Sequence, residues 1–499
     1  MSTFFHARRL LLSHLLEKFC LLQSFWARCV AAPQPGLVGQ TGASRPAQAG
    51  AKKSPQDFAP LTQACFDDPY PFYQTLRADA PVYQLPNGIY CVSRYADIQE
   101  VCMDTATYSS KYQGIAATIK PGQDIEKLGR QIAKLAEWGL TPADVLAVDD
   151  PPGHMAQRKA IGRGFALQAI KDTEPMVAAL AREILDEFLP RGEMDFVHDM
   201  GWRLPMLVIM RVLGLPDSDF AQVKDGALHA ISLQTGIADA AAVGAHQAGA
   251  LRLVRYSWAQ FLAAQKRDPQ GQGARGVSPL MAMLIRATLP AAADATPAMS
   301  RAQAVSAIFQ LLVAGSDSSA TSMGSAIKML LDNPSLADEI RADLDGKLDA
   351  FIEEVFRLEA AFQGHFRWVK QDTALHGVAL PRGSRVFLIW AAGNRDESVF
   401  PNPGAIDLQR ANGRKHLTFG WGAHACIGRE LARSEIRIVL REMLTRSKNW
   451  QQVGAAPYMA SMFSRSLEHL PLRFAARSAD DNSSPVVAAA LALPAGQEV

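Results

Sequence analysis

Apolar positions recur at i, i+3 and i+4 along most of the chain, which is the spacing of helices that bury one face. This spacing predicts helices over residues 68–78, 154–168, 174–189, 222–230, 247–266, 300–332, 335–348, 349–358 and 429–448. Alternating apolar and polar positions are fewer and occur in short runs. They predict strands over residues 82–85, 89–92, 374–380 and 384–389, with a turn containing Pro and Gly inside each pair. We therefore expect a mainly α fold with small β-sheets.

The two ends of the chain differ in composition from this periodic region. The chain has 499 residues, of which 48% are hydrophobic and 20% charged, so it can bury a large core. Between residues 54 and 476 we find no long linker and no internal repeat, and we expect one large domain there. Residues 1–53 are interpreted as an N-terminal extension, either a targeting or amphipathic segment or the product of a start codon assigned too far upstream. Residues 477–499 are expected to be a disordered C-terminal tail.

Charge and cysteine usage exclude several classes of protein. The 51 Lys and Arg against 49 Asp and Glu give a net charge of +2, which lacks the strongly basic field of nucleic-acid-binding proteins. The six cysteines form no Cys-x-x-Cys pair, so they imply neither a zinc site nor a disulfide framework, and a reducing compartment such as the cytoplasm fits best. Glu17 and Lys18 interrupt the apolar stretch near the N-terminus, which is therefore no clean membrane span. Peripheral membrane contact through residues 1–30 stays open.

The strongest chemical signal lies in residues 419–428, Phe-Gly-Trp-Gly-Ala-His-Ala-Cys-Ile-Gly, which lead into a predicted helix. The glycines permit tight turns that leave backbone N–H groups free to point at the sulfur of Cys426. The N-terminus of the following helix adds positive potential. Both effects lower the pKa of a cysteine and favour a thiolate, which serves as a metal ligand or as a nucleophile. The structural alternative is a small buried thiol. Spacing alone does not separate haem ligation from a catalytic thiol.

This segment matches Phe-Gly-x-Gly-x-His-x-Cys-x-Gly at every fixed position, and in it the chain resembles the cytochrome P450 superfamily, in its bacterial form. The resemblance implies that Cys426 is the axial ligand of the iron in haem b, iron protoporphyrin IX, where a thiolate favours O–O cleavage. It also implies that His424 contacts a haem propionate and that Phe419 packs beside the thiolate. Gly428 completes the cofactor-binding loop.

Other segments of the family pattern occur upstream in the right order. Glu354 and Arg357, spaced i,i+3 on a predicted helix, resemble the Glu-x-x-Arg pair of the family, which implies a buried structural ion pair joined by Arg410. An exposed ion pair of little energetic value is the alternative. The resemblance covers roughly residues 60–476.

The resemblance also implies which basic residues hold the haem propionates. Arg367 is one, because a guanidinium presents several donors to a carboxylate and stays charged. His154 and Arg158, spaced i,i+4 on one helical face, are two more. Their alternative is a solvated basic face.

Residues 308–321 are apolar and then abruptly small and polar, which resembles the oxygen-binding helix of the family. Asp317 and Ser318 would be the catalytic acid–alcohol pair that relays protons to dioxygen. Small residues and hydroxyls also permit a local opening of the helix, since hydroxyls can satisfy the freed carbonyls. Most members carry threonine where Ser318 stands, so rotamer control is expected to be weaker. A helix cap or turn at Asp317 and Ser318 is the alternative.

The expected activity is that of a monooxygenase with the cytochrome P450 fold. It would insert one atom of O2 into an apolar small molecule, by hydroxylation or epoxidation, and release the other as water. Electrons would come from NAD(P)H through separate proteins, a ferredoxin and a ferredoxin reductase, because the sequence after Cys426 leaves no room for a fused reductase. Positive side chains would dock the ferredoxin, namely Lys415, Arg429 and Arg433. By family analogy, residues 108–148, 206–243, 363–366 and 462–463 would line the substrate pocket.

Three other functions remain at this stage. A peroxide-driven peroxygenase of the same fold is the nearest, but such members tend to lose the acid–alcohol pair that Asp317 and Ser318 retain. A non-catalytic haem-binding protein would bind haem without substrate-dependent use of NADH. A cysteine hydrolase would need no haem.

Overall fold

The computed structural model describes residues 53–111, 136, 137, 139, 141–235, 240–292 and 295–477. Apart from Lys53 and Arg477, the expected N-terminal extension and C-terminal tail lie outside these residues, as do most of residues 112–140 of the expected substrate pocket. In the described part of the chain, no helix has the length and apolar character needed to cross a membrane.

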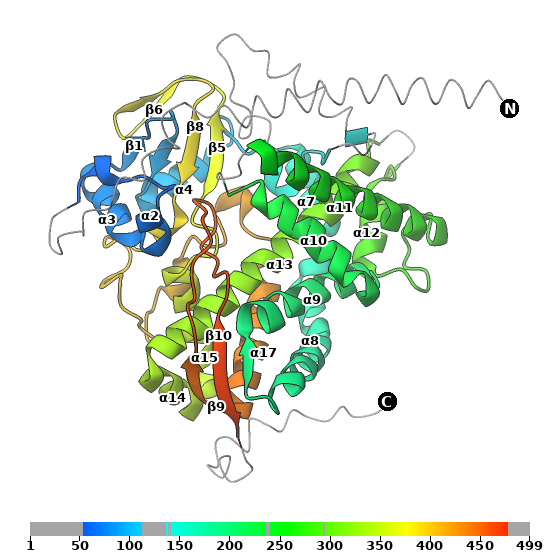
Figure 1. Cartoon of the computed structure of the whole chain (residues 1–499). Helices are drawn as coiled ribbons and strands as arrows, with labels where there is room; N and C mark the ends of the chain where they lie inside the picture. The colour runs from blue at the N-terminus through cyan, green and yellow to red at the C-terminus, as the bar shows by residue number, and fades with distance from the viewer. Residues whose placement is uncertain are drawn as a thin grey trace.

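Helices make up most of the described chain (Figure 1). They are α2 (Gln63–Asp67), α3 (Tyr70–Asp79), α4 (Tyr95–Met103), α7 (Gly153–Ile161), α8 (Leu167–Phe188), α9 (Arg203–Leu213), α10 (Phe220–Ser232), α11 (Ala240–Arg267), α12 (Pro279–Ala287), α13 (Arg301–Asp332), α14 (Pro334–Ala342), α15 (Leu344–Leu358), α16 (Trp390–Gly393) and α17 (Arg429–Arg446). Two short turns matter below, the π-helical η4 (Val197–Gly201) and the 3-10 helix η7 (Gly422–His424).

The strands are short and form small sheets. One sheet has the order β1-β2-β8-β5-β3, a second β4-β10-β9, and a third pairs β6 with β7. Their bounds are β1 (Val82–Gln84), β2 (Tyr90–Val92), β3 (Tyr108–Ser109), β4 (Glu193–Asp195), β5 (His365–Val369), β6 (Thr373–Leu375), β7 (Val378–Leu380), β8 (Arg385–Leu388), β9 (Ser447–Gln452) and β10 (Pro471–Ala476). The expected mainly α fold with small β-sheets is therefore confirmed.

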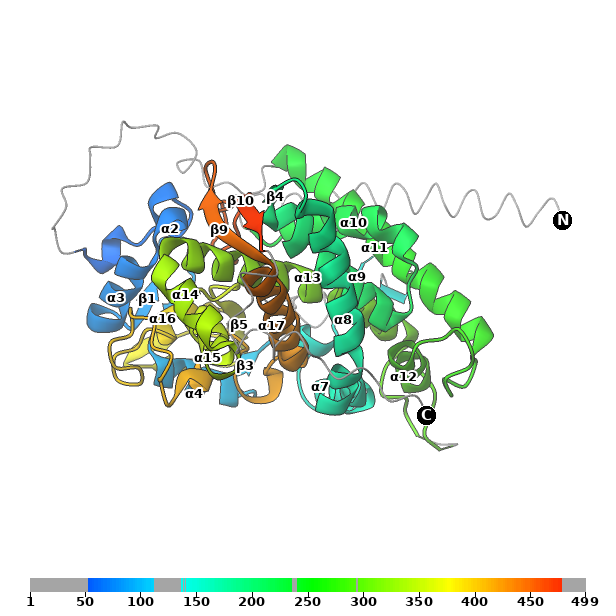
Figure 2. The same cartoon turned by 90° about the horizontal axis from the view of Figure 1, so that it is seen from below.

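Helix α13 passes through the middle of the molecule in both views (Figures 1 and 2). It packs against α9, α11, α15 and α17. Its start is fixed by a capping box, in which the Ser300 hydroxyl accepts the Gln303 N–H at 3.2 Å and the Gln303 side chain accepts the Ser300 N–H at 2.9 Å. The largest hydrophobic cluster surrounds this helix, and two smaller clusters lie around the five-stranded sheet. This sheet joins segments far apart in the sequence, because β2 pairs in parallel with β8.

Some predicted helices have different bounds. The single helix predicted over residues 335–348 is wrong, because Asp343 ends α14 and caps α15 by accepting the Gly346 N–H. The helix predicted over residues 154–168 ends earlier, at Ile161. Helix α9 was not predicted, because eight of its eleven residues are buried and only Arg203 and Arg211 mark its polar side.

The second predicted strand pair is also wrong. Residues 374–380 were expected to form one strand opposite residues 384–389, but they fold back on themselves as the β6–β7 hairpin. His376 and Gly377 both adopt positive φ at the turn, with values of 53° and 76°. Strand β8 instead pairs with β2 and β5. The first predicted pair is confirmed, because β1 and β2 form an antiparallel hairpin.

Candidate active site

The loop before α17 holds Cys426 in a fixed conformation. Gly420 and Gly422 adopt positive φ, which only glycine adopts without strain, and the Cys426 N–H donates to the Phe419 carbonyl at 2.7 Å. A side chain at Gly422 would also meet the Met103 sulfur at 3.0 Å and the Cys102 carbonyl at 3.2 Å. The loop therefore lies tightly against α4, and its glycines are required by the local geometry.

Several donors surround the Cys426 sulfur. The Cys426 side chain is exposed, but the protein atoms crowded near it act to raise the pKa of the thiol. The Gly428 N–H, which donates to the sulfur, and the charges of Arg158, Arg429 and Arg433 act in the opposite direction on this pKa. These are the groups that a thiolate needs around it, and they come from the loop itself, from α7 and from α17.

Basic side chains from three elements meet beside this loop. His154 and Arg158 come from α7, Arg367 from β5 and His424 from η7. The rings of His154 and His424 have centroids 4.1 Å apart. Burial, together with the charges of Arg367, His154 and Arg158, lowers the pKa of His424 to about 2. The structure thus brings together the four residues that the sequence suggested as propionate ligands.

Polar atoms in this cluster lack partners among the described residues. His154 Nδ1 and both ring nitrogens of His424 are buried without a hydrogen-bond partner there. Leaving a buried polar atom unpaired costs about 1–3 kcal/mol. Donors left without acceptors next to two arginines fit a ligand that brings carboxylates into the protein, and a haem with its two propionates is such a ligand. The residues present therefore fit haem.

A further histidine of this cluster was not predicted as a site residue. His365 lies two residues before Arg367 on β5, and its Nδ1 accepts the Trp390 Nε1–H at 2.9 Å. This hydrogen bond places the His365 proton on Nε2. Burial, together with the charge of Arg367, lowers the pKa of His365 to about 3. The signal was available, since residues at i and i+2 of a strand point to the same face.

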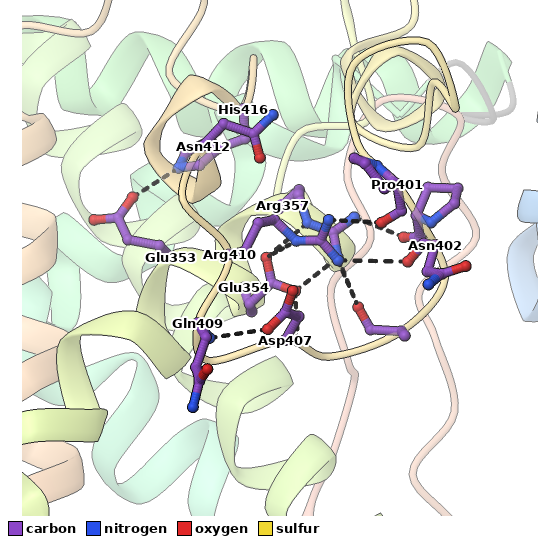
Figure 3. Close-up of polar contacts among 12 residues, drawn as sticks. Glu353, Glu354, Arg357, Pro401, Asn402, Asp407, Gln409, Arg410, Asn412 and His416 are labelled. Carbon is purple, nitrogen blue, oxygen red and sulfur yellow. Dashed lines mark hydrogen bonds and ion pairs between the residues drawn. The ribbon is translucent and has the colours of Figure 1, made fainter.

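Glu354 forms a buried network that fixes the chain entering the cysteine loop (Figure 3). Arg357 donates to both carboxylate oxygens of Glu354 at 2.7 Å, and Arg410 donates to one of them at 3.0 Å. The side chains of Glu354 and Arg357 are 1% and 0% exposed. Arg357 also donates to the carbonyls of Asn394, Pro403 and Ala405. The network therefore connects α15 to residues 394–410.

Glu353, the neighbour of Glu354, connects the same helix to the other side of the loop. It accepts from Arg433 of α17 at 2.7 Å. It also accepts from His416 at 3.1 Å (Figure 3). Burial acts to raise the pKa of Glu353, but the hydrogen bonds from His416 and Arg433 outweigh it and lower the pKa to about 2. Arg433 was expected to dock a redox partner, and this prediction is wrong because Arg433 is buried, is paired with Glu353 and Glu430, and covers the Phe419 ring.

Phe419 packs within the protein at the start of the loop. Its ring lies edge-on to Phe356 of α15, with centroids 4.7 Å apart, and 5.5 Å from the ring of His416. The loop is therefore anchored by aromatic packing as well as by hydrogen bonds.

Asp317 and Ser318 lie midway along α13. The helix is continuous from Arg301 to Asp332, so the predicted local opening is wrong. The hydroxyls nevertheless bond to helix carbonyls as expected, since Ser318 Oγ donates to the Ala314 carbonyl at 2.8 Å and Ser316 Oγ to the Leu312 carbonyl at 2.7 Å. Asp317 is buried, and burial raises its pKa to about 7. Ala314, one turn before Ser318, is exposed within this otherwise buried helix.

A second buried acid contacts this helix and was not predicted. Glu435 of α17 is buried, and burial raises its pKa to about 8, partly offset by a hydrogen bond from Ser319 of α13. Its position carried a signal, because Glu435 follows the buried Leu431 by four residues and so occupies an apolar stripe.

Comparisons with known proteins agree with this geometry. A family model described as "Cytochrome P450" matches residues 258–448. "Cytochrome P450 144" of Mycobacterium tuberculosis is 32% identical over 413 residues, which cover 81% of this chain and 88% of that protein. "Cytochrome P450 BJ-3" of Bradyrhizobium diazoefficiens is 29% identical, covering 84% of this chain and 96% of that protein.

Solved structures give the same result for the fold. "Cytochrome P450 CREJ in complex with (4-ethylphenyl) dihydrogen phosphate" is similar with a TM-score of 0.74 and 25% identity, over 84% of this chain and 100% of that chain. Together with the curated relatives and the cysteine loop, these similarities identify the family. This chain belongs to the cytochrome P450 family of haem-thiolate monooxygenases.

Proposed function

We propose that Cys426 is the axial thiolate ligand of haem b, in an enzyme that oxygenates an apolar small molecule. The observation that carries the proposal is the joint arrangement of the Cys426 loop and the convergent donors His154, Arg158, Arg367 and His424. Bound haem with a thiolate ligand supplies the activation of O2. The protein's own residues then have to hold the cofactor, orient the substrate and deliver protons.

The four donors would hold the haem propionates. Arg158 and Arg367 provide permanent charge, and guanidinium–carboxylate pairs are strong and directional. His154 and His424 stay neutral near pH 7, because burial lowers the pKa of both, so each can donate one N–H without adding charge. His365 adds a fifth N–H to the same cluster. The two arginines would thus balance the charge of the two haem propionates, and the neutral histidines would add hydrogen bonds to them.

Asp317 and Ser318 would deliver protons to dioxygen. Because the pKa of Asp317 is about 7, the acid and its carboxylate are both populated near neutral pH, which suits a group that must give and regain protons. The Ser318 hydroxyl can rotate away from the Ala314 carbonyl and pass a proton onward.

Separate redox proteins would supply the electrons, from NAD(P)H through a ferredoxin and its reductase. Lys415 and Arg429 are exposed beside the cysteine loop, and an exposed positive surface steers an acidic partner. One solved neighbour, "an intact type IV self-sufficient cytochrome P450 monooxygenase", has a longer chain, of which this protein covers 56%, at a TM-score of 0.75.

The substrate would be an apolar small molecule. Two of the segments expected to line its pocket meet, since the ring of Phe463 lies 5.1 Å from the His365 ring and 4.8 Å from the Phe362 ring. Aromatic and aliphatic walls with few polar groups favour apolar ligands.

The absorption spectrum of the reduced, CO-bound protein tests the ligand. We expect the band of a thiolate-ligated haem in the wild type, its loss in Cys426→Ala, and its retention in Cys91→Ala, a control that removes a buried thiol from β2. A band typical of histidine-ligated haem in the wild type, or an unchanged band in Cys426→Ala, would refute the proposal.

Product formation separates this function from a peroxygenase. With NADH, ferredoxin and reductase, the enzyme should form product faster than with peroxide alone, because Asp317 and Ser318 serve proton delivery to dioxygen. Faster turnover with peroxide alone would favour the peroxygenase.

A further inference from the structure

Three potential metal ligands gather where β4 meets β10, outside the site described above (Figure 2). Asp195 is the last residue of β4, His198 lies in the turn η4 that follows, and His469 precedes β10. The antiparallel pairing places Pro471 opposite Asp195, and this register brings His469 next to the carboxylate. Two segments separated by more than 270 residues thus contribute to one cluster.

The three side chains are close enough to bind one ion. His469 Nδ1 lies 2.6 Å from Asp195 Oδ2, and the rings of His198 and His469 have centroids 4.8 Å apart. One possible ligand atom from each residue lies within 4.8 Å of the others. Ligand atoms around a zinc ion at 2.0–2.2 Å lie roughly 3–4 Å apart, so small side-chain rotations close the site.

The backbone already orients the carboxylate. Asp195 Oδ1 accepts the N–H of Leu470 at 3.0 Å and that of Val197 at 3.2 Å. These bonds leave Oδ2 facing the imidazoles. Metal-binding carboxylates are commonly fixed in this way by partners outside the coordination sphere.

The charges around the cluster suit a cation. The Asp195 carboxylate accepts hydrogen bonds from His469 and from the Leu470 N–H, and it supplies the negative charge of the cluster. Asp199 adds a second acid, whereas the nearby Lys224 opposes a bound cation.

We propose that Asp195, His198 and His469 bind one divalent transition-metal ion and that this ion is Zn²⁺. Two imidazole nitrogens and one carboxylate oxygen form a donor set that zinc accepts and that Ca²⁺ or Mg²⁺ does not prefer. Both histidines are exposed, so water completes the coordination. The ion would fasten β4 and η4 to the segment that enters β10.

Calorimetric titration of the haem-loaded full chain with ZnCl₂ tests this site. We expect the wild type to bind one equivalent more than His469→Asn and His198→Asn. The matched control is His376→Asn, which removes a partly exposed imidazole that likewise lies beside an aspartate, Asp97, at 3.9 Å. His376→Asn should keep the full stoichiometry. Asparagine also tolerates the positive φ of residue 376.

Thermal unfolding gives a second, independent measurement. Zn²⁺ should raise the Tm of the wild type and of His376→Asn, because an ion that binds only the folded state stabilises it, and it should leave the Tm of His469→Asn unchanged. The CO-bound spectrum checks that each variant is folded. Equal zinc stoichiometry and equal affinity in the wild type and in both cluster variants would overturn the proposal.

Discussion

Removing the Glu354 carboxylate is expected to destabilise the whole fold. Glu354→Ala leaves two buried guanidiniums, those of Arg357 and Arg410, without their negative partner. It also removes the acceptor of the Asp407 N–H, which lies 2.9 Å from the Glu354 carboxylate. The backbone carbonyls that Arg357 contacts remain, so part of its hydrogen bonding survives, but no charge replaces the carboxylate.

The expected magnitude follows from burial. Removing one partner of a buried ion pair costs about 3–5 kcal/mol, because it leaves an uncompensated charge. Since globular proteins are stable by about 5–15 kcal/mol, this is a large fraction of the total. Asp349→Ala, in the same helix, is the matched control. Asp349 pairs with Arg437, and their side chains are 52% and 33% exposed, so its loss should cost no more than about 1 kcal/mol.

Urea unfolding of the haem-loaded proteins, followed by far-UV circular dichroism and by the haem absorption, measures both effects. Glu354→Ala should also incorporate less haem, because its network holds residues 394–410, and Asn394 in turn holds Leu417 and Thr418 just before the loop. Equal unfolding free energies for Glu354→Ala and Asp349→Ala would refute the reasoning. So would a destabilised Glu354→Ala that binds haem as completely as the wild type at low temperature.

Three other substitutions give distinct results. Asp317→Asn should slow turnover by about 10²- to 10⁴-fold. It should also stabilise the fold relative to the wild type, by up to roughly 4 kcal/mol as the pH rises from 3.8 to about 7, because the folded wild type resists ionising a buried acid whose pKa is raised to about 7. Turnover assays and urea unfolding at several pH values check both effects, and an unstabilised, fully active variant would contradict the prediction. Ser318→Thr should raise the ratio of product to peroxide roughly two- to tenfold, because a rotamer preference is worth about 0.5–1.5 kcal/mol. Less peroxide means more product for each NADH consumed, so an unchanged ratio of product to NADH would speak against rotamer control. Reversing the charge of both Lys415 and Arg429 should slow reduction by ferredoxin about tenfold or more at low salt and less at high salt, as measured by stopped-flow formation of the CO complex, and a salt-independent rate would exclude docking there.

The sequence predicted the chemistry of the site better than its surroundings. His154, Arg158, Arg367 and His424 lie in short motifs that resemble the pattern of the family, and the structure brings all four together. His365 was missed because residues 365–369 were not predicted as a strand, and only on a strand does its position two residues before Arg367 place both side chains on one face.

Tertiary contacts decided the features that were predicted wrongly. Arg433 lies one turn into a helix rich in charged residues, which predicts an exposed side chain. In the structure it is buried, because it forms an ion pair with Glu353, eighty residues earlier. Residues 374–380 have a strand pattern throughout, and only the positive φ values of His376 and Gly377 reveal the hairpin. Packing against the rest of the protein buries eight of the eleven residues of α9, so that only Arg203 and Arg211 mark its polar side in the sequence.

The adjacent acids Glu353 and Glu354 have a consequence for how the protein is made. Each joins α15 to a partner synthesised much later, Arg410 at a separation of 56 residues and Arg433 at a separation of 80. A nascent chain that has not yet released residue 433 from the ribosome can close at most one of these contacts. Cofactor capture should therefore be a late event in biosynthesis, after nearly all of the helical scaffold has been translated. Ribosome-bound chains stalled before residue 433 should retain little haem, whereas those stalled beyond the end of α17 should retain it.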